Sequence, residues 1–572
     1  MQHCVLAMHG LRVRYGQQAV SLRNMAWRHA LLTFLLLLGA CTAPEPPATP
    51  TAPLPTATPR PRLPADAAAA FFAAWQQAQF GAMYDLLSSG AQATTSRDVF
   101  VRRYTNIRNG IGETKLIVQP SPPPAESDAT ATQSQVPFEV TRSLPIFGDL
   151  SESNVLPLVQ EDGIWKVAWQ PGLIFSGLTA TSTVRVAPDV AARGRILDRT
   201  GKPLADNGAI LAVGVVPGEI QDETTLLKAM SDALGLSADT IKQRYQGGQP
   251  TWFMPVAVRS AAERPDLQAK LGALGGVALQ DRPARVYPLG PAAAHVVGYV
   301  SHPTADELRQ LAAAGYDETD WIGRAGIEAS FEQQLSGTRG GTIQIVDSGS
   351  KVLRTVAQKA AVAGQDITLS LDSVIQQEAL AVLGDKLGSA VVMDPRDRSI
   401  LALASQPSFD PNQFVIGLSD AQWQELNGPT RPLVLRATES AYPTGSIFKI
   451  ITLAAGLENG VVKTSDTFDC GPDWNGLPGV TLHNWQPQGT LKLTEALTES
   501  CNPACYEIGL RLDRLDPTIL PTFARRFGLG AATSTPGVQE VSGTVPDPTW
   551  KQATLKEPWS SGDSVNLAIG QG

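Results

Sequence analysis

Residues 442–451 read YPTGSIFKII, and this stretch places a serine and a lysine at the start of an apolar run that continues to Leu457. Pro443 and Gly445 break the preceding chain, so a helix is expected to begin near Ser446. Lys449 follows three residues later, and residues i and i+3 share one face of a helix. Because the run is apolar on nearly all sides, we expect the helix to be buried.

A serine beside a buried lysine can act as a nucleophile. The hydroxyl is weak at neutral pH and needs an adjacent base. A lysine amine serves as that base only where burial and neighbouring groups lower its pKa. The start of the helix also favours negative charge that develops near Ser446. The alternative is a serine at a helix start with a lysine that reaches solvent, because the S-x-x-K spacing alone is common.

A second group of polar residues, Thr498 to Asn502, follows 54 residues after Ser446. Ser500 offers a second hydroxyl that could pass a proton to a leaving group. Asn502 offers both a donor and an acceptor. The alternative is a capping serine and a turn asparagine. Cys501 and Cys505 are four residues apart on an expected helix, and we predict free thiols there rather than a disulfide.

Composition narrows the class of protein. The chain has 572 residues, 43% of them hydrophobic, which predicts three or four domains. Its net charge of −8, without basic clusters, argues against a nucleic-acid partner. Its 6 histidines never pair at metal-ligand spacing, so no metal site and no cofactor are predicted. Its 5 cysteines are too few for a scaffold built from disulfides.

The N-terminus carries an export signal. Arg28 precedes an apolar run, Ala30–Leu38, that is too short for the ~20 residues of a membrane-spanning helix. Gly39 and Ala40 then precede Cys41, and this order resembles a bacterial lipobox. By that resemblance, the Cys41 thiol carries a diacylglycerol and becomes the mature N-terminus. An ordinary secretory peptide is the alternative, and translation could begin at Met25 instead of Met1.

The chain after the signal divides into a linker and three globular segments. The linker is rich in proline and threonine, which predicts a semi-rigid tether. The first segment has helix and strand patterns, the second has glycine-rich turns, and the third has predicted strands at Ile367–Leu371, 390–393 and 400–404. The boundaries are 1–41 for the signal, 42–64 for the linker, and 65–178, 184–364 and 365–572 for the three segments.

These motifs together resemble class B penicillin-binding proteins. S-x-x-K followed by S-x-N is the signature of penicillin-binding proteins and serine β-lactamases. The stretch YPTGSIFK resembles the family's Y-P-P-G-S-T-F-K, and residues 568–572 match its A-I-G-Q-G. RGRILDRTG (193–201), RVYP (285–288) and GRAGIE (323–328) resemble its dimerisation or pedestal domain. The first segment ends in WQPGLIFSGL (169–178) and resembles the nuclear-transport-factor-two-like (NTF2-like) domain of methicillin-resistance-type members.

The resemblance implies a multidomain α+β fold. An NTF2-like domain would be followed by an elongated pedestal domain and by a C-terminal α/β sandwich of the serine penicillin-binding protein and β-lactamase type. It also implies a peptidoglycan D,D-transpeptidase that acts from the outer face of the cytoplasmic membrane. Its implied partners are stem peptides, β-lactams, the membrane through Cys41, and cell-wall glycosyltransferases.

The resemblance also implies a role for each site residue. Ser446 would attack the D-Ala-D-Ala amide or a β-lactam, and its backbone N–H would form half of an oxyanion hole. Lys449 would accept the proton of Ser446. Ser500 would pass a proton to the leaving nitrogen, and Asn502 would hold the substrate amide and Lys449.

Two departures from the family pattern affect this reading. The third family motif, K-[ST]-G, is absent, which predicts that the chain is truncated before it, that the catalytic sheet is incomplete and that the chain as given is inactive. Ile447 stands where the family has threonine, with little expected effect. The alternatives are a serine β-lactamase, a β-lactam sensor, and an inactive envelope scaffold that binds β-lactams.

Overall fold

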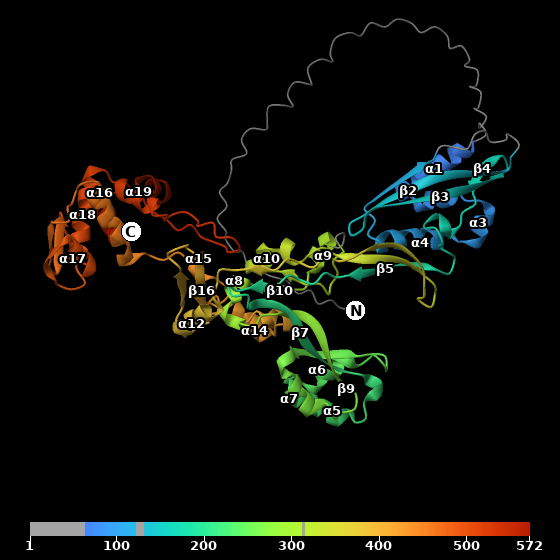
Figure 1. Ribbon diagram of the computed structural model, residues 1–572, viewed down its shortest axis with the longest axis horizontal. Helices are drawn as coiled ribbons and strands as arrows, with labels where there is room; N and C mark the ends of the chain where they lie inside the picture. Colours follow the sequence, from blue (N-terminus) through green and yellow to red (C-terminus); the bar gives the residue numbers. More distant parts are fainter. Residues whose placement is uncertain (1–62, 122–130, 312–314) are drawn as a thin grey trace, which may run out of the picture. The chain divides into compact units, whose positions relative to one another are not determined.

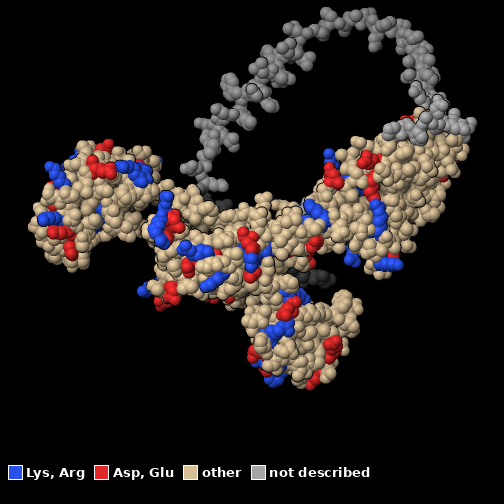
Figure 2. Space-filling view, in the orientation of Figure 1, with Lys and Arg blue, Asp and Glu red and all other residues tan. Residues whose placement is uncertain are grey.

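The computed structural model describes residues 63–121, 131–311 and 315–572 (Figure 1). The signal and nearly all of the linker lie outside these residues, so the lipobox is not among them. No helix in the described ranges is long and apolar enough to cross a membrane. Positive and negative side chains are interspersed over the face shown in Figure 2. The mixture of helices and strands confirms the predicted multidomain α+β fold.

The first domain is an antiparallel sheet with helices packed against it (Figure 1). Its strand order is β1-β2-β3-β4, and α1 contacts three of the four strands. The strands are β1 (Lys115–Pro120), β2 (Gln133–Leu144), β3 (Gly148–Glu161) and β4 (Ile164–Val167). The helices are α1 (Pro64–Gln76), α2 (Phe80–Asp85), α3 (Ser89–Thr94) and α4 (Arg97–Gly110).

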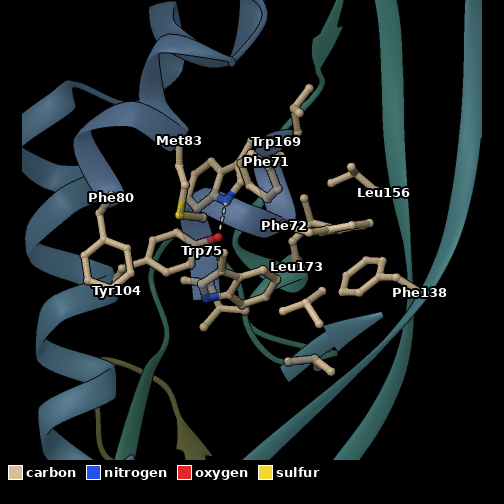
Figure 3. Packing of buried hydrophobic residues seen from close by; sticks show 14 of the residues in the cluster. Phe71, Phe72, Trp75, Phe80, Met83, Tyr104, Phe138, Leu156, Trp169 and Leu173 are labelled. Carbon is tan, nitrogen blue, oxygen red and sulfur yellow. Dashed lines mark hydrogen bonds between the residues drawn. The ribbon is translucent and has the colours of Figure 1, made fainter. Parts of the chain in front are cut away.

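Aromatic side chains fill the core of this domain (Figure 3). Phe72 of α1 packs on Phe138 of β2 with ring centroids 4.9 Å apart. The indole N–H of Trp169 donates to the hydroxyl of Tyr104 over 3.1 Å, so the buried polar atoms of both rings are paired. Trp169 lies beyond the end of β4.

The second segment contains two larger sheets and a short strand pair. Strand β7 lies between β8 and β9, and three helices, α5, α6 and α7, cover this sheet with apolar side chains. The sheets contain β5 (Thr183–Asp189), β6 (Ile196–Leu197), β7 (Pro203–Val215), β8 (Met254–Ser260), β9 (Val277–Val286), β12 (Gly340–Val346), β13 (Val352–Lys359) and β14 (Ile367–Thr368). The helices are α5 (Glu223–Leu234), α6 (Ala238–Tyr245) and α7 (Arg264–Leu271), and β10 (Val300–Ser301) pairs with β11 (Ile322–Gly323).

Three motifs of the second segment meet at one buried carboxylate. Glu328 of α10 (Gly326–Ser330) is fully buried and pairs with two arginines. Arg193 Nη2 lies 2.7 Å from Glu328 Oε2, and Arg285 Nε donates to Glu328 Oε1 over 2.7 Å. The hydroxyl of Tyr287 donates to the same oxygen over 3.4 Å. These motifs therefore hold the segment together, which fits the scaffold role inferred from the sequence.

The third segment begins with a small sheet and its covering helix. Helix α12 (Ser373–Leu383) is capped by Asp372 and packs on the pair β15 (Gly388–Met393) and β16 (Ile400–Gln406). Both strands agree with the prediction, but the strand expected over 367–371 contains only two residues. The turn between β15 and β16 holds Arg398 at φ 65. Among the described residues, β15 pairs only with β16.

The rest of the third segment is mainly helical and forms a second core. Helices α16 (Lys449–Glu458) and α18 (Asn502–Leu515) pack against each other, and α19 and α21 pack around them. The other elements are α17 (Leu493–Thr498), α19 (Ile519–Arg526), α20 (Pro548–Thr554), α21 (Ser561–Leu567), β17 (Thr467–Cys470), β18 (Asp473–Leu477), β19 (Val480–His483) and β20 (Gly489–Lys492). This core positions the residues considered next.

Candidate active site

The predicted nucleophile lies in a tight turn at the start of a helix. Residues Gly445–Phe448 form a 3₁₀ turn that leads directly into α16. Gly445 has φ 57, a left-handed conformation that favours glycine. Ser446 is exposed, whereas the side chain of Lys449 is buried at 1% exposure. The turn thus presents the hydroxyl to solvent and directs the amine inward.

The A-I-G-Q-G segment braces this turn from behind. Gly445 donates its N–H to the carbonyl of Gly570 over 3.0 Å. The buried hydroxyl of Thr452 donates to the carbonyl of Ala568 over 2.7 Å. Gly570 has φ 71, and a side chain there would overlap the Gly445 carbonyl and lie 2.5 Å from Thr444 Oγ1. Only glycine therefore lets the two backbones approach so closely.

The S-x-N residues form a second turn, between α17 and α18. Ser500 has φ 54, which is uncommon for a residue other than glycine. The turn directs both the carbonyl and the hydroxyl of Ser500 toward Lys449. Lys449 Nζ donates to Ser500 O over 2.7 Å, to Ser500 Oγ over 3.0 Å and to Asn502 Oδ1 over 2.6 Å.

The four predicted site residues thus lie in one hydrogen-bonded cluster. Ser500 Oγ is 3.1 Å from Ser446 Oγ. Ser500 therefore links the hydroxyl of Ser446 to the amine of Lys449, where the i, i+3 spacing had predicted direct contact. A proton that leaves Ser446 can reach Lys449 through one intervening hydroxyl.

Burial gives Lys449 the character of a base. Removal from water disfavours the charged ammonium and lowers the pKa of Lys449. The neighbouring titratable group is the thiol of Cys505 on α18, and burial raises the pKa of that thiol to about 12. Because the thiol stays protonated at neutral pH, it supplies no negative charge to hold the proton on Lys449.

The prediction of a free thiol at Cys501 is wrong. Cys501 forms a disulfide with Cys470 at the end of β17, while Cys505 is free and buried. The two bonded cysteines are 31 residues apart, and the turn between α17 and α18 brings them together. Sequence spacing gives no signal for such a pair, because the contact depends on the tertiary fold.

Sequence reasoning also missed the segment that supports the S-x-N turn. The indole N–H of Trp485 donates to the carbonyl of Ser500 over 3.2 Å. Asn484 Oδ1 accepts from the backbone N–H of Asn502 over 3.2 Å, and the side-chain amide of Gln488 donates to the carbonyl of Glu499. Polar and aromatic residues in a loop carry no periodic pattern that would have identified them.

The expectation of a helix buried on all sides holds only in part. Lys449, Ile451 and Leu453 of α16 are buried, but Ile450 is 54% exposed and Leu457 is 40% exposed. Ile447, in the turn before the helix, is 76% exposed. The packing of α18, α19 and α21 covers one side of α16 within the described part of the chain.

The described residues contain no cluster of three or more potential metal ligands.

Three known families match successive parts of the chain. Residues 63–182 match the NTF2-like N-terminal transpeptidase domain. Residues 188–369 match the penicillin-binding protein dimerisation domain. Residues 388–571 match the penicillin-binding protein transpeptidase domain. The order of the three agrees with the order of motifs along the sequence.

Several individual proteins are also similar. The chain is 32% identical over 408 residues to penicillin-binding protein 3 of Bacillus subtilis, covering 70% of this chain and 60% of that protein. It is 33% identical over 407 residues to the peptidoglycan D,D-transpeptidase MrdA of Escherichia coli K12, covering 68% and 63% respectively. The chain thus spans about three fifths of the length of these curated relatives.

Solved structures are also similar to this chain. The chain is similar to penicillin-binding protein PBP2 of Helicobacter pylori, solved in complex with MreC, with a TM-score of 0.55, 28% identity, and coverage of 68% of this chain and 74% of that one. A structure from a peptidoglycan synthase complex has a TM-score of 0.53 and 30% identity, with coverage of 68% of each chain. From its three matched domains and these relatives, the chain belongs to the class B penicillin-binding proteins.

Proposed function

We propose that this protein is a peptidoglycan D,D-transpeptidase that works through an acyl-enzyme on Ser446. The observation that carries the proposal is the line of hydrogen bonds from Ser446 through Ser500 to the buried amine of Lys449, at 3.1 and 3.0 Å. A nucleophile, a relay and a base of lowered pKa are what acyl transfer requires. The similar proteins named as penicillin-binding proteins and D,D-transpeptidases support the same chemistry.

The proposed reaction begins with attack of Ser446 Oγ on the carbonyl carbon of the D-Ala-D-Ala amide. As the C–O bond forms, Ser446 passes its proton to Ser500, and Ser500 passes its own to neutral Lys449. The tetrahedral intermediate then expels the terminal D-Ala, whose nitrogen takes the proton back through Ser500. An amine of a neighbouring stem peptide then attacks the ester carbonyl, its proton passes through Lys449 and Ser500 to Ser446 Oγ as the C–O bond breaks, and the new amide bond is the cross-link.

Two further groups have roles in this proposal. Asn502 holds Lys449 through its Oδ1, and its amide N–H₂ is assigned to the substrate amide. The backbone N–H of Ser446 lies at the start of the turn that leads into α16 and would donate to the developing oxyanion. β-Lactams would acylate the same hydroxyl and remain attached.

The proposed location is the outer face of the cytoplasmic membrane. A diacylglycerol on Cys41 would anchor the protein, and residues 42–64 would act as the tether. The implied partners are stem peptides, β-lactams and cell-wall glycosyltransferases. Complexes of similar proteins with MreC and in a peptidoglycan synthase support such partners.

Penicillin labelling tests the assignment of the nucleophile. The protein should bind fluorescent penicillin covalently, and Ser446→Ala should abolish this labelling. Ser465→Ala, at an exposed serine outside the cluster, is the matched control and should label normally. Labelling that survives in Ser446→Ala would reject the nucleophile. Rapid turnover of the penicillin, with release of the hydrolysed product, would indicate a serine β-lactamase instead.

A further inference from the structure

A disulfide lies inside the second catalytic motif. Cys501 is the middle residue of Ser500-Cys501-Asn502 and caps α18, its sulfur accepting the N–H of Ala504 over 3.3 Å. Its partner Cys470 is the last residue of β17. Both cysteines are fully buried. The bond therefore ties the turn that carries Ser500 and Asn502 to the end of a strand.

The turn adopts a conformation that needs support. Ser500 has φ 54, which brings its Cβ close to its own carbonyl and is unfavourable for residues other than glycine. In this conformation the carbonyl and hydroxyl of Ser500 both meet Lys449 Nζ, at 2.7 and 3.0 Å. A relaxed backbone at Ser500 would turn one of these groups away. The geometry of the relay thus depends on what holds this turn.

A second link joins the same two places without a covalent bond. Gln488 donates its backbone N–H to the carbonyl of Cys470 over 2.8 Å. Asn484 Nδ2 donates to the same carbonyl over 3.3 Å, and Asn484 Oδ1 accepts the N–H of Asn502 over 3.2 Å. Asn484 thus bridges the residues on either side of the disulfide. These bonds can retain the fold when the disulfide is broken, although they are weaker than a covalent bond.

We propose that the Cys470–Cys501 disulfide is a positioning element for acylation, so that breaking it slows the reaction of Ser446 without unfolding the protein. This inference rests on the function proposed above. A dithiol such as dithiothreitol would break the bond: it becomes a cyclic disulfide and loses two electrons and two protons. Cys470 and Cys501 each gain one electron and one proton and become thiols.

Two changes are expected in the reduced protein. The rate constant for acylation falls at least about tenfold, because the carbonyl and the hydroxyl of Ser500 no longer both contact Lys449 Nζ. The acid limb of the pH profile, where this rate constant rises with pH, moves to higher pH. Water that enters the relaxed turn relieves the burial of Lys449, and the pKa of Lys449 then rises toward its ordinary value. The adjacent thiol of Cys505, with a pKa of about 12, adds no titration in this range.

The test compares the oxidised protein with the same protein reduced by dithiothreitol. Acylation by a fluorescent penicillin is timed over a series of pH values up to the ordinary lysine pKa of ~10.4. Thiol counting shows that the bond is broken, and circular dichroism shows that the fold remains. The Cys470→Ser/Cys501→Ser double variant should be acylated as slowly as the reduced protein, and dithiothreitol should not change its rate constant. Cys505→Ser keeps the disulfide, so dithiothreitol should still slow its acylation.

The outcomes separate the two proposals. Unchanged rate constants and an unchanged acid limb in fully reduced protein would overturn the positioning role. A smaller amount of labelled protein with the same rate constant and acid limb would show a purely structural bond and would also overturn it. If the double variant fails to fold, reduction of the folded wild type decides the matter. If the oxidised protein is not acylated at all, the proposed function is what fails.

Discussion

At the scale of single residues, the site depends on one buried amine, Lys449, whose pKa burial lowers. Lys449 makes three hydrogen bonds to the S-x-N turn and is 1% exposed. Burial favours the neutral amine, which has two N–H groups for Ser500 O and Asn502 Oδ1 and one lone pair that can accept from Ser500 Oγ. The proposed reactivity of Ser446 therefore depends on the meeting of two turns rather than on either motif alone.

The first prediction concerns the titration of Lys449. Its pKa is lowered, so the acylation rate constant should rise with pH as the ammonium loses its proton, with a midpoint below the ordinary lysine value of ~10.4. Lys449→Arg, which stays charged, should lose about a thousandfold in rate at neutral pH. Lys463→Arg, at an exposed lysine, is the control. An arginine variant with the wild-type rate would exclude Lys449 as the base.

The second prediction separates close packing from backbone strain at glycine. Gly570 and Gly543 have nearly equal φ values, 71 and 70, but only Gly570 lies against another backbone. Gly570→Ala should lower the free energy of unfolding by about 2 kcal/mol more than Gly543→Ala, because overlap with Gly445 adds to the shared strain. It should also slow acylation. Urea unfolding and penicillin labelling measure the two effects, and equal losses would argue against the bracing role.

The residues that the sequence identified and those it missed differ in one physical respect. Ser446 and Lys449 are three residues apart, so local helix geometry predicts that they lie close together. Cys470 and Cys501 meet only through the tertiary fold, and the partner of Gly570 is a backbone more than a hundred residues earlier. Contacts of that kind leave no periodic trace in the sequence.

At the scale of secondary-structure elements, the second segment is held by charges rather than by one apolar core alone. A loop, strand β9 and helix α10 converge on Glu328 through Arg193 and Arg285. The two partners of Glu328 are 135 and 43 residues away in sequence, so the pairing closes long loops. Removal of the Glu328 carboxylate would leave the buried charge of Arg285 without a counter-ion, whereas Arg193 would keep its pair with Glu332.

The third prediction follows from that convergence. Glu328→Gln should lower the free energy of unfolding by about 3–5 kcal/mol, because the buried guanidinium of Arg285 loses its carboxylate, while Arg193 keeps its pair with Glu332. Asp232→Asn removes a carboxylate of an exposed i, i+4 pair with Lys228 and should change it by less than about 0.5 kcal/mol. Chemical denaturation of both variants gives the comparison. Similarly small losses of unfolding free energy in both variants would mean that the motifs around Glu328 contribute little to stability.

The elements themselves were predictable where the local signals were strong. Helix α16 begins directly after the turn that holds Ser446, and β15 and β16 contain the strands predicted over 390–393 and 400–404. The strand expected at Ile367–Leu371 is two residues long, because its pairing partner β6 is equally short. Strand length is set by the partner, which a single segment of sequence does not contain.

At the scale of the whole molecule, the sequence predicted the order of domains better than their internal contacts. Motifs distributed along the chain identified the three parts, and the matched families follow the same order. The net charge of the chain is −8, and Figure 2 shows interspersed positive and negative side chains with no extended basic patch on the face shown. The three domains therefore follow one another along the chain as modules, and the proposed catalytic residues lie in the last.

The fourth prediction concerns how these modules are held at the membrane. Lipidation of the Cys41 thiol is the proposed anchor. Cys41→Ser should therefore stop incorporation of a fatty-acid label and move the protein out of the membrane fraction. Cys4→Ser is the matched control, because Cys4 lies outside the lipobox and precedes the alternative start at Met25. Metabolic labelling followed by fractionation measures both variants. Label that persists in Cys41→Ser would place the lipid elsewhere, and the proline-rich stretch 42–64 would then no longer be the tether between membrane and enzyme.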